Sequence, residues 1–353
     1  MLTAAILITI LVALVFDFVN GMNDAANSIA TIVSTRILSP RIAVMWAAFW
    51  NFAALFIFDE SKVAGTVGKG IVQSAFIDEY MILASLLGAI IWAYFFCARF
   101  GIPVSSSHSL TGGLIGAAIA KGGSAALILS SDAGGFFTTK IFLIIAFIFM
   151  APIIGLLMGY LIMVLTLTIA RSSTPQKVDK IFRIGQLMSS AAFSIGHGGN
   201  DAQKTMGIIT VLLFASKDVP FVRDYLYWHD DFVVPIWVKV TSLLVISLGT
   251  LSGGWKIVRT MGVKLTHLKP VGGFSAETAG AITLYTATAM GIPVSTTQTI
   301  AGAIMGVGTT KRLSAVRWGV AGNIVLTWLL TIPFSALFAG LSYYIIHLFL
   351  RSQ

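Results

Sequence analysis

Two aspartates carry the strongest chemical signal in the sequence, because each lies in apolar chain beside a glycine and an asparagine. Asp24 ends the sequence GMND, and Asp201 ends the sequence GGND. An ionisable side chain in an apolar segment is costly and is usually retained for function. Glycine lets a chain leave a helix, and Asn or Asp caps the helix that follows, so we expect a helix break at each motif whose oxygens bind a small hard cation. The alternative is that each aspartate only caps a buried kink. The candidate cation ligands are Asn23, Asp24, Asn200 and Asp201, with the nearby hydroxyls of Ser105 and Ser295.

A second motif places three hydroxyl residues after a proline, and it also occurs twice. Residues 103–107 read PVSSS, and residues 293–297 read PVSTT. Proline and the glycine before it end one helix, and the free N–H groups that start the next helix form a site for an oxyanion. The alternative is that the hydroxyls only bond to their own helices. We expect the two tips to meet around one anion, with the candidate ligands Ser105, Ser106, Ser107, Ser295, Thr296 and Thr297.

Together the two motifs favour an oxyanion that travels with a cation or a proton. A bare carboxylate beside a bare oxyanion repels it, so either a bound cation offsets the charge or the carboxylate accepts a proton that the anion carries. Phosphate keeps a proton near neutral pH, whereas sulfate does not. Asp24 and Asp201 therefore favour phosphate over sulfate as the ligand.

The composition is that of a membrane protein. Of the 353 residues, 57% are hydrophobic and only 10% are charged, and the mean hydropathy is +0.90, whereas about 25% of residues are charged in soluble domains. This excludes a cytosolic enzyme, a disordered protein and a nucleic-acid binder, and the single cysteine, Cys97, excludes an intrachain disulfide. The net charge of +9 comes from cations in loops between apolar runs, as the positive-inside rule requires. These runs, read as membrane helices, cover residues 2–19, 25–35, 42–58, 81–100, 141–170, 184–195, 206–215, 232–251, 279–291 and 318–350.

The order of the motifs indicates an internal duplication, because the Asp motif and the hydroxyl motif follow each other in both halves. We divide the chain into a first repeat over 1–170, a cytoplasmic linker over 171–183 and a second repeat over 184–353. The predicted fold class is an all-α polytopic membrane protein with two inverted-topology repeats, broken helices and re-entrant hairpins.

The distribution of cations favours inverted rather than parallel repeats. If each half makes three crossings and one hairpin, with the N-terminus outside, most Lys and Arg residues of the loops lie inside. The first hairpin is expected over 81–121, turning at 101–103. The count of crossings depends on residues 63–76, which we interpret as an interfacial amphipathic helix.

At these residues the sequence resembles the inorganic phosphate transporter family, known as PiT. The family signature GANDVAN stands here as GMNDAAN over 21–27 and as GGNDAQK over 198–204. The family's hydroxyl motif ends in His108 in the first half and in Gln298 in the second. The resemblance covers nearly the whole chain and implies phosphate uptake by secondary active transport coupled to Na⁺ or H⁺, an inverted-repeat fold and a homodimer. Further substrate-binding candidates are Gln298, Asn27 and Lys204.

Lys204 stands where the first half has Asn27, so the halves are not equivalent. Its ammonium either supplies positive charge near the anion or snorkels to solvent. His108 and His197 flank the motifs and are expected to form hydrogen bonds. Asp17 and Glu277 are further acidic candidates for a cation site.

We therefore predict a phosphate symporter, not an enzyme, that crosses the cell's inner or plasma membrane several times and is surrounded by lipid. No organic cofactor is expected. Sodium is the preferred coupling ion, because Asn-Asp motifs with nearby hydroxyls resemble oxygen cages, but a proton on one carboxylate stays open. The transport unit would move like an elevator against a dimer scaffold built from the long helices over 141–170 and 318–350. The alternatives are a sulfate permease of the same fold, a passive anion channel and an intramembrane aspartyl protease.

Overall fold

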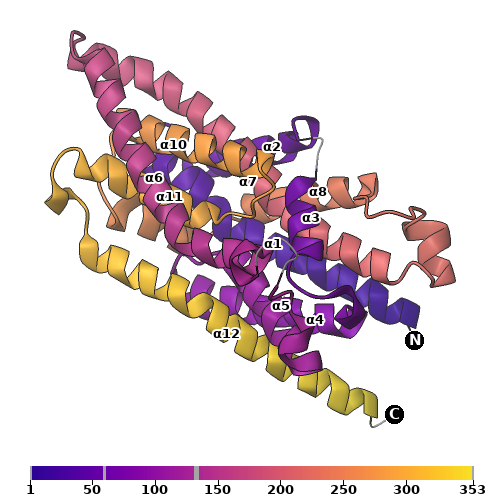
Figure 1. Ribbon diagram of the computed structural model, residues 1–353. Helices are drawn as coiled ribbons and strands as arrows, with labels where there is room; N and C mark the ends of the chain where they lie inside the picture. Colours follow the sequence, from indigo (N-terminus) through magenta and orange to yellow (C-terminus); the bar gives the residue numbers. More distant parts are fainter. Residues whose placement is uncertain (1, 59–60, 131–134, 352–353) are drawn as a thin grey trace.

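The protein is a bundle of α-helices, seen in a computed structural model that describes residues 2–58, 61–130 and 135–351 (Figure 1). No β-sheet occurs in these residues, and one isolated bridge joins Val72 to Leu127. The α-helices are α1 (Leu2–Ser34), α2 (Pro40–Ala53), α3 (Lys62–Lys69), α4 (Glu79–Ile90), α5 (Ser106–Gly122), α6 (Lys140–Ala170), α7 (Pro175–Ala215), α8 (Ile236–Ser252), α9 (Trp255–Arg259), α10 (Pro270–Ala289), α11 (Thr296–Thr309) and α12 (Trp318–Arg351).

Within the described residues, four helices are long and apolar enough to cross a membrane, and a fifth span results if α8 and the helix after it are counted as one span bent by 64°. The four are Leu2–Ser34, Glu79–Ala98, Lys140–Ala170 and Trp318–Leu350. The helix α7 extends from Pro175 to Ala215, so most of the predicted linker over 171–183 is the first part of a helix rather than a loop.

The predicted breaks at the two Asp motifs are wrong, because α1 and α7 continue as helices through both of them. The glycines there allow close packing instead. A β-carbon on Gly21 would lie 2.1 Å from the carbonyl oxygen of Ile246 in α8, and one on Gly198 would lie 2.4 Å from that of Asn51 in α2. A side chain at either position would force the helices apart, so glycine serves the contact between helices and not a change of direction.

The predicted chain reversals do occur, and they form two helical hairpins. The helix α4 continues as a π-helix over Ile91–Ala98, and the chain turns at Gly101, with φ +67°, before α5 begins. In the second half the chain leaves α10, turns at Gly291 with φ +70° and enters α11. Positive φ favours glycine, so these two glycines define the turns.

The helix predicted over 63–76 is shorter than expected, and it is amphipathic, with one buried face and with Lys62 and Lys69 exposed. Its helical part, α3, has eight residues, or about 12 Å of length at 1.5 Å per residue, which is too short to cross about 30 Å of hydrocarbon. It packs against α7, where a β-carbon on Gly207 would lie 2.5 Å from the carbonyl oxygen of Ala64. Thr66 donates a 2.7 Å hydrogen bond to the carbonyl of Gly291. The short helix thus supports the turn of the second hairpin.

The hairpin of each half packs against the long helix of the other half. The helix α11 packs against α6, and α5 packs against α12, which runs along α5 and α4 at the lower edge of the view (Figure 1). Glycines make both contacts: a β-carbon on Gly306 would lie 2.0 Å from the carbonyl oxygen of Leu156, and one on Gly116 would lie 2.0 Å from that of Ala336. Each hairpin is therefore positioned by a helix that belongs to the other half.

Candidate functional site

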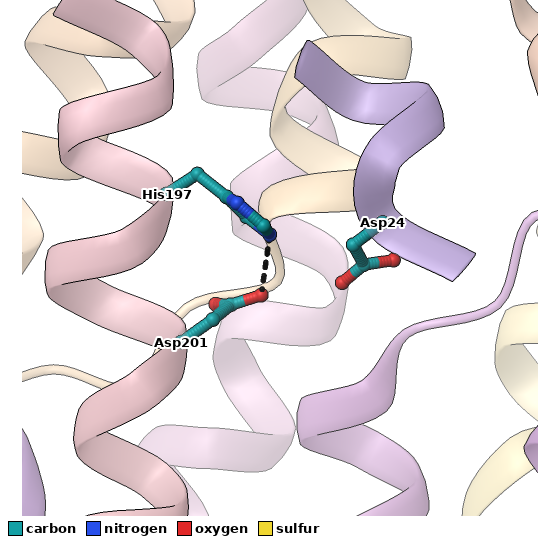
Figure 2. A group of neighbouring side chains, drawn as sticks. All are labelled: Asp24, His197 and Asp201. Atoms are coloured by element: carbon teal, nitrogen blue, oxygen red, sulfur yellow. Dashed lines mark ion pairs between the residues drawn. The ribbon is translucent and has the colours of Figure 1, made fainter. Parts of the chain in front are cut away.

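The two Asp motifs meet in the interior, in the C-terminal half of α1 and of α7. Asp24 projects from α1 towards Asp201 and His197 of α7 (Figure 2). One ligand atom of each of these three residues lies within 4.8 Å of the others, and all three side chains are buried. Because α1 and α7 are continuous here, the carboxylates project from helix sides and do not cap helix ends.

The tips of the two hairpins contact each other beside these carboxylates. Ser107 donates a 3.1 Å hydrogen bond to the carbonyl of Val294, and Thr297 lies 3.1 Å from the carbonyl of Val104. These are the same contact made twice, because Ser107 and Thr297 hold the same place in the two hydroxyl motifs. The N-terminal ends of α5 and α11 therefore lie next to each other.

Hydroxyls of the tips face both carboxylates. Thr297 Oγ1 lies 3.1 Å from Asp24 Oδ1. Thr296 Oγ1 lies 3.1 Å from Asp201 Oδ2 and 3.5 Å from Asp24 Oδ2. Ser106 Oγ is 3.4 Å from Asp24 Oδ2. Each carboxylate thus has hydroxyl partners at the start of a helix, where the helix dipole also favours negative charge.

Lys204 is buried in this site, so the snorkelling alternative is wrong. Its side chain is only 2% exposed. The ammonium pairs with Asp201 and donates to Ser107 Oγ at 2.5 Å and to the carbonyl of Val294 at 2.9 Å. Its counterpart Asn27 is also buried and donates through Nδ2 to Thr297 Oγ1 at 3.0 Å.

His197 links the site to the neighbouring helices. Its Nε2 lies 3.3 Å from Asp201 Oδ2, and its Nδ1 lies 3.1 Å from Asn51 Oδ1 of α2. Asn51 in turn donates to Thr250 of α8 at 2.9 Å. The expected hydrogen-bonding role of His197 is confirmed, but its place on the Asp201 carboxylate was not expected; the four-residue spacing of the pair on one helix is the signal in the sequence.

Several predicted ligands lie at the edge of the site with other partners. The hydroxyls of Ser105 and Ser295 accept the backbone N–H of His108 and Gln298 and so cap α5 and α11. These contacts satisfy helix ends, so the hydroxyls serve the helices before any ligand. The side chains of His108 and Gln298 lie 3.5 Å apart.

The asparagines that precede the two aspartates donate hydrogen bonds to the backbone of the hairpins. Asn23 donates to the carbonyl of Ala93 at 3.3 Å, and Asn200 donates to the carbonyl of Ile292 at 3.2 Å. The amide oxygens of Asn23, Asn27 and Asn200 are buried without a hydrogen-bond partner among the described residues. Unpaired buried acceptors are costly, so these oxygens are available to a cation.

The further acidic candidates form separate clusters. Glu277 accepts hydrogen bonds from Thr31 at 2.5 Å, Ser189 at 2.5 Å and Gln186 at 3.0 Å. Asp17 accepts one from Thr205 at 2.8 Å. Among the described residues, neither carboxylate has a hydrogen bond to the hairpin tips.

A prediction follows from the caps. Ser295→Ala should lower the stability of the protein by about 1 kcal/mol, the usual cost of a lost N-cap, and should leave the cation dependence of transport unchanged. Thermal unfolding in detergent measures the first effect, with Thr286→Ala as control because that hydroxyl bonds only within its own exposed helix turn. An unchanged melting temperature with a weakened cation response would show that Ser295 is a ligand instead.

Membrane-length helices around a buried site that offers both anion-binding and cation-binding groups define a multi-pass membrane transport protein for an ion. The chain belongs to the phosphate transporter family, whose sequence profile matches residues 20–339. It is an integral membrane protein of the plasma membrane. The family indicated by the two motifs is thereby confirmed.

Relatives and a solved structure cover nearly the whole chain. A probable low-affinity inorganic phosphate transporter of Rhizobium meliloti is 51% identical over 338 residues, which are 95% of this chain and 94% of that one. A protein of Bacillus subtilis with the same description is 39% identical, over 97% of this chain and 98% of that one. A solved structure described as the sodium-dependent phosphate transporter matches with a TM-score of 0.82 and 24% identity, covering 98% of this chain and 99% of that chain. At this identity the structure shows the fold.

Proposed function

We propose that the protein imports inorganic phosphate by secondary active symport with Na⁺. One observation carries the proposal: Asp24 and Asp201 lie against hydroxyls at the starts of α5 and α11, where two helix N-termini meet in a buried site. Helix N-termini bind oxyanions. The carboxylates repel such an anion unless a cation or a proton accompanies it, and this requirement couples the two solutes.

Sodium is the favoured partner because of the ligand types. The site offers carboxylate oxygens, threonine hydroxyls, backbone carbonyls and the unpaired amide oxygens of Asn23, Asn27 and Asn200. Hard cations prefer such oxygen ligands. The solved neighbour's description as sodium-dependent points the same way. Proton coupling through one carboxylate is the second candidate, since a proton needs only one of these groups.

The inverted relation of the repeats and the re-entrant position of the hairpins belong to the same proposal. The reciprocal contacts Ser107–Val294 and Thr297–Val104 support a two-fold relation between the halves. For the motion, we propose that a transport unit moves like an elevator against a homodimer scaffold of α6 and α12. Both helices expose leucines, such as Leu161 at 56% and Leu341 at 50%, that a second copy or lipid would cover.

The experiment is uptake of labelled phosphate into proteoliposomes, with an inward Na⁺ gradient, an inward H⁺ gradient or neither. We expect uptake that needs Na⁺ and is not competed by excess sulfate, and empty liposomes provide the background. Uptake driven only by H⁺ would replace sodium with a proton. Strong sulfate competition would overturn the substrate, and equal uptake without any gradient would indicate a passive channel.

The protease alternative has no support in the comparisons. The curated relatives are described as transporters, and Asp201 is engaged by Lys204 rather than held ready for acid–base chemistry.

A further inference from the structure

The two halves place corresponding carboxylates, hydroxyls and carbonyls around the site, but an asparagine of the first half is replaced by a lysine in the second. Asp24 corresponds to Asp201, and Asn27 corresponds to Lys204. The hairpin groups correspond as well: the Thr297 hydroxyl and the Val104 carbonyl on one side, and the Ser107 hydroxyl and the Val294 carbonyl on the other. Each half of the site therefore contains a cage of three oxygens, from a carboxylate, a hydroxyl and a carbonyl.

In the cage of Asp201, the Lys204 ammonium takes the place of a bound cation. An ammonium has three N–H donors, and the structure gives three acceptors: Asp201 Oδ1, Ser107 Oγ and the carbonyl oxygen of Val294. All three donors are thus used by the protein, and none is left to point at a ligand. The ammonium is coordinated as a metal cation would be, but it cannot leave.

In the cage of Asp24, no such cation is supplied by the chain. Asp24 has no ion pair with a lysine or arginine within the described ranges. The single hydroxyl proton of Thr297 has two acceptors at 3.1 Å, Asp24 Oδ1 and the carbonyl oxygen of Val104, and can satisfy only one of them. The neighbouring amide of Asn27 donates to Thr297, but its own oxygen is buried without a partner. This cage is rich in acceptors, and no lysine or arginine of the described residues occupies it.

We propose that Lys204 is a tethered cation that permanently fills the cage of Asp201 and leaves the cage of Asp24 as the one exchangeable cation site beside the anion. The proposal rests on the proposed symport function and specifies the number of exchangeable cations that bind beside the anion. A chain with asparagine in both positions would have two exchangeable sites here, whereas this chain has one. Net charge in the site then changes by one unit, rather than two, when the coupling cation binds.

The test replaces Lys204 with the residue of the other half. Lys204→Asn should convert the cage of Asp201 into a second exchangeable site, so the Na⁺ dependence of phosphate uptake should steepen from a slope of about one to about two. A tenfold fall in Na⁺ below half-saturation would then reduce uptake about 100-fold in the variant and about tenfold in the wild type. Saturating Na⁺ should restore uptake. If protons drive uptake, the same titration is made with pH.

The reverse exchange is the matched control. Asn27→Lys should place an ammonium in the cage of Asp24, so that purified protein binds phosphate without Na⁺ and no longer transports in response to a Na⁺ gradient. Monodisperse elution from a sizing column shows that both variants are folded.

The readouts separate this proposal from the function on which it rests. Loss of phosphate binding in Lys204→Asn at every Na⁺ concentration would show that the lysine is a ligand of the anion, and an unchanged slope would show that its cage binds no cation; either result overturns the proposal. If the wild type transports no phosphate, the proposed function fails. The cation count is then measured by the rise of the melting temperature with Na⁺, which should be about twice as steep in Lys204→Asn as in the wild type, and equal slopes would overturn the tethered cation.

Discussion

Asp24→Asn should abolish coupled phosphate uptake and leave the protein folded. In the proposed site Asp24 supplies the charge that holds the exchangeable cation, and removing one partner of a buried ion pair costs about 3–5 kcal/mol, which corresponds to a loss of about 100-fold or more. The folded protein should tolerate the change, because no described lysine or arginine pairs with Asp24 and the amide can still accept from Thr297. Initial uptake rates in proteoliposomes and thermal unfolding in detergent measure the two effects.

The Asp201→Asn variant should be less stable than the Asp24→Asn variant. This change leaves the Lys204 ammonium buried without its counter-charge, so the protein should lose folded yield as well as uptake. The double variant Asp201→Asn with Lys204→Met should regain stability but not transport. Asp224→Asn is the control, because that carboxylate is exposed. Wild-type uptake by both single variants would defeat the assignment of the site.

The second large effect is expected at the glycines that join the halves. Gly306→Ala and Gly116→Ala should each prevent assembly of the native bundle or lower its stability by about 3 kcal/mol, a large overpacking cost. The added carbon would lie 2.0 Å from a backbone carbonyl oxygen of α6 or α12, and backbone cannot rotate away as a side chain can. Folded yield and melting temperature report the loss.

Gly322→Ala is the matched control for these variants. It makes the same change within α12 at a position where no atom lies within 4 Å of the new carbon, and Ala favours a helix over Gly. We expect this variant to be as stable as the wild type or slightly more stable. If all three variants have the same melting temperature, the helices can move apart without loss of stability, and their close approach does not hold the halves in place.

The sequence predicts the hairpins better than the helix breaks, for a physical reason. A Gly-x-Pro turn is decided locally, because proline removes a donor and glycine accepts positive φ, and the turns at Gly101 and Gly291 follow that rule. Glycine inside a motif such as GMND is ambiguous, since it permits both a break and a close approach. The carbonyl of Ile246 that requires Gly21 lies far away in the sequence. The residues next to Gly21 therefore could not show that this glycine serves a helix contact and not a helix break.

The residues that meet in the interior could be predicted, but their pairings could not. Two symmetric aspartates and two hydroxyl motifs already indicate an anion site with a cation. The place of Lys204 could not be predicted, because two of its three partners, Ser107 and Val294, come from different hairpins. The capping of α11 by Ser295 follows from its position before a helix, which shows that a hydroxyl in a motif can serve the fold first.

The crossed hairpin tips bear on how such a chain could arise. Each tip hydroxyl uses a carbonyl of the other tip, and each hairpin packs on a long helix of the other half. A half-length ancestor would therefore have lacked both its partner groups and its support when alone. It would have worked only as a pair of identical chains, and fusion of two such genes would allow one copy of the motif to acquire a lysine without changing the other.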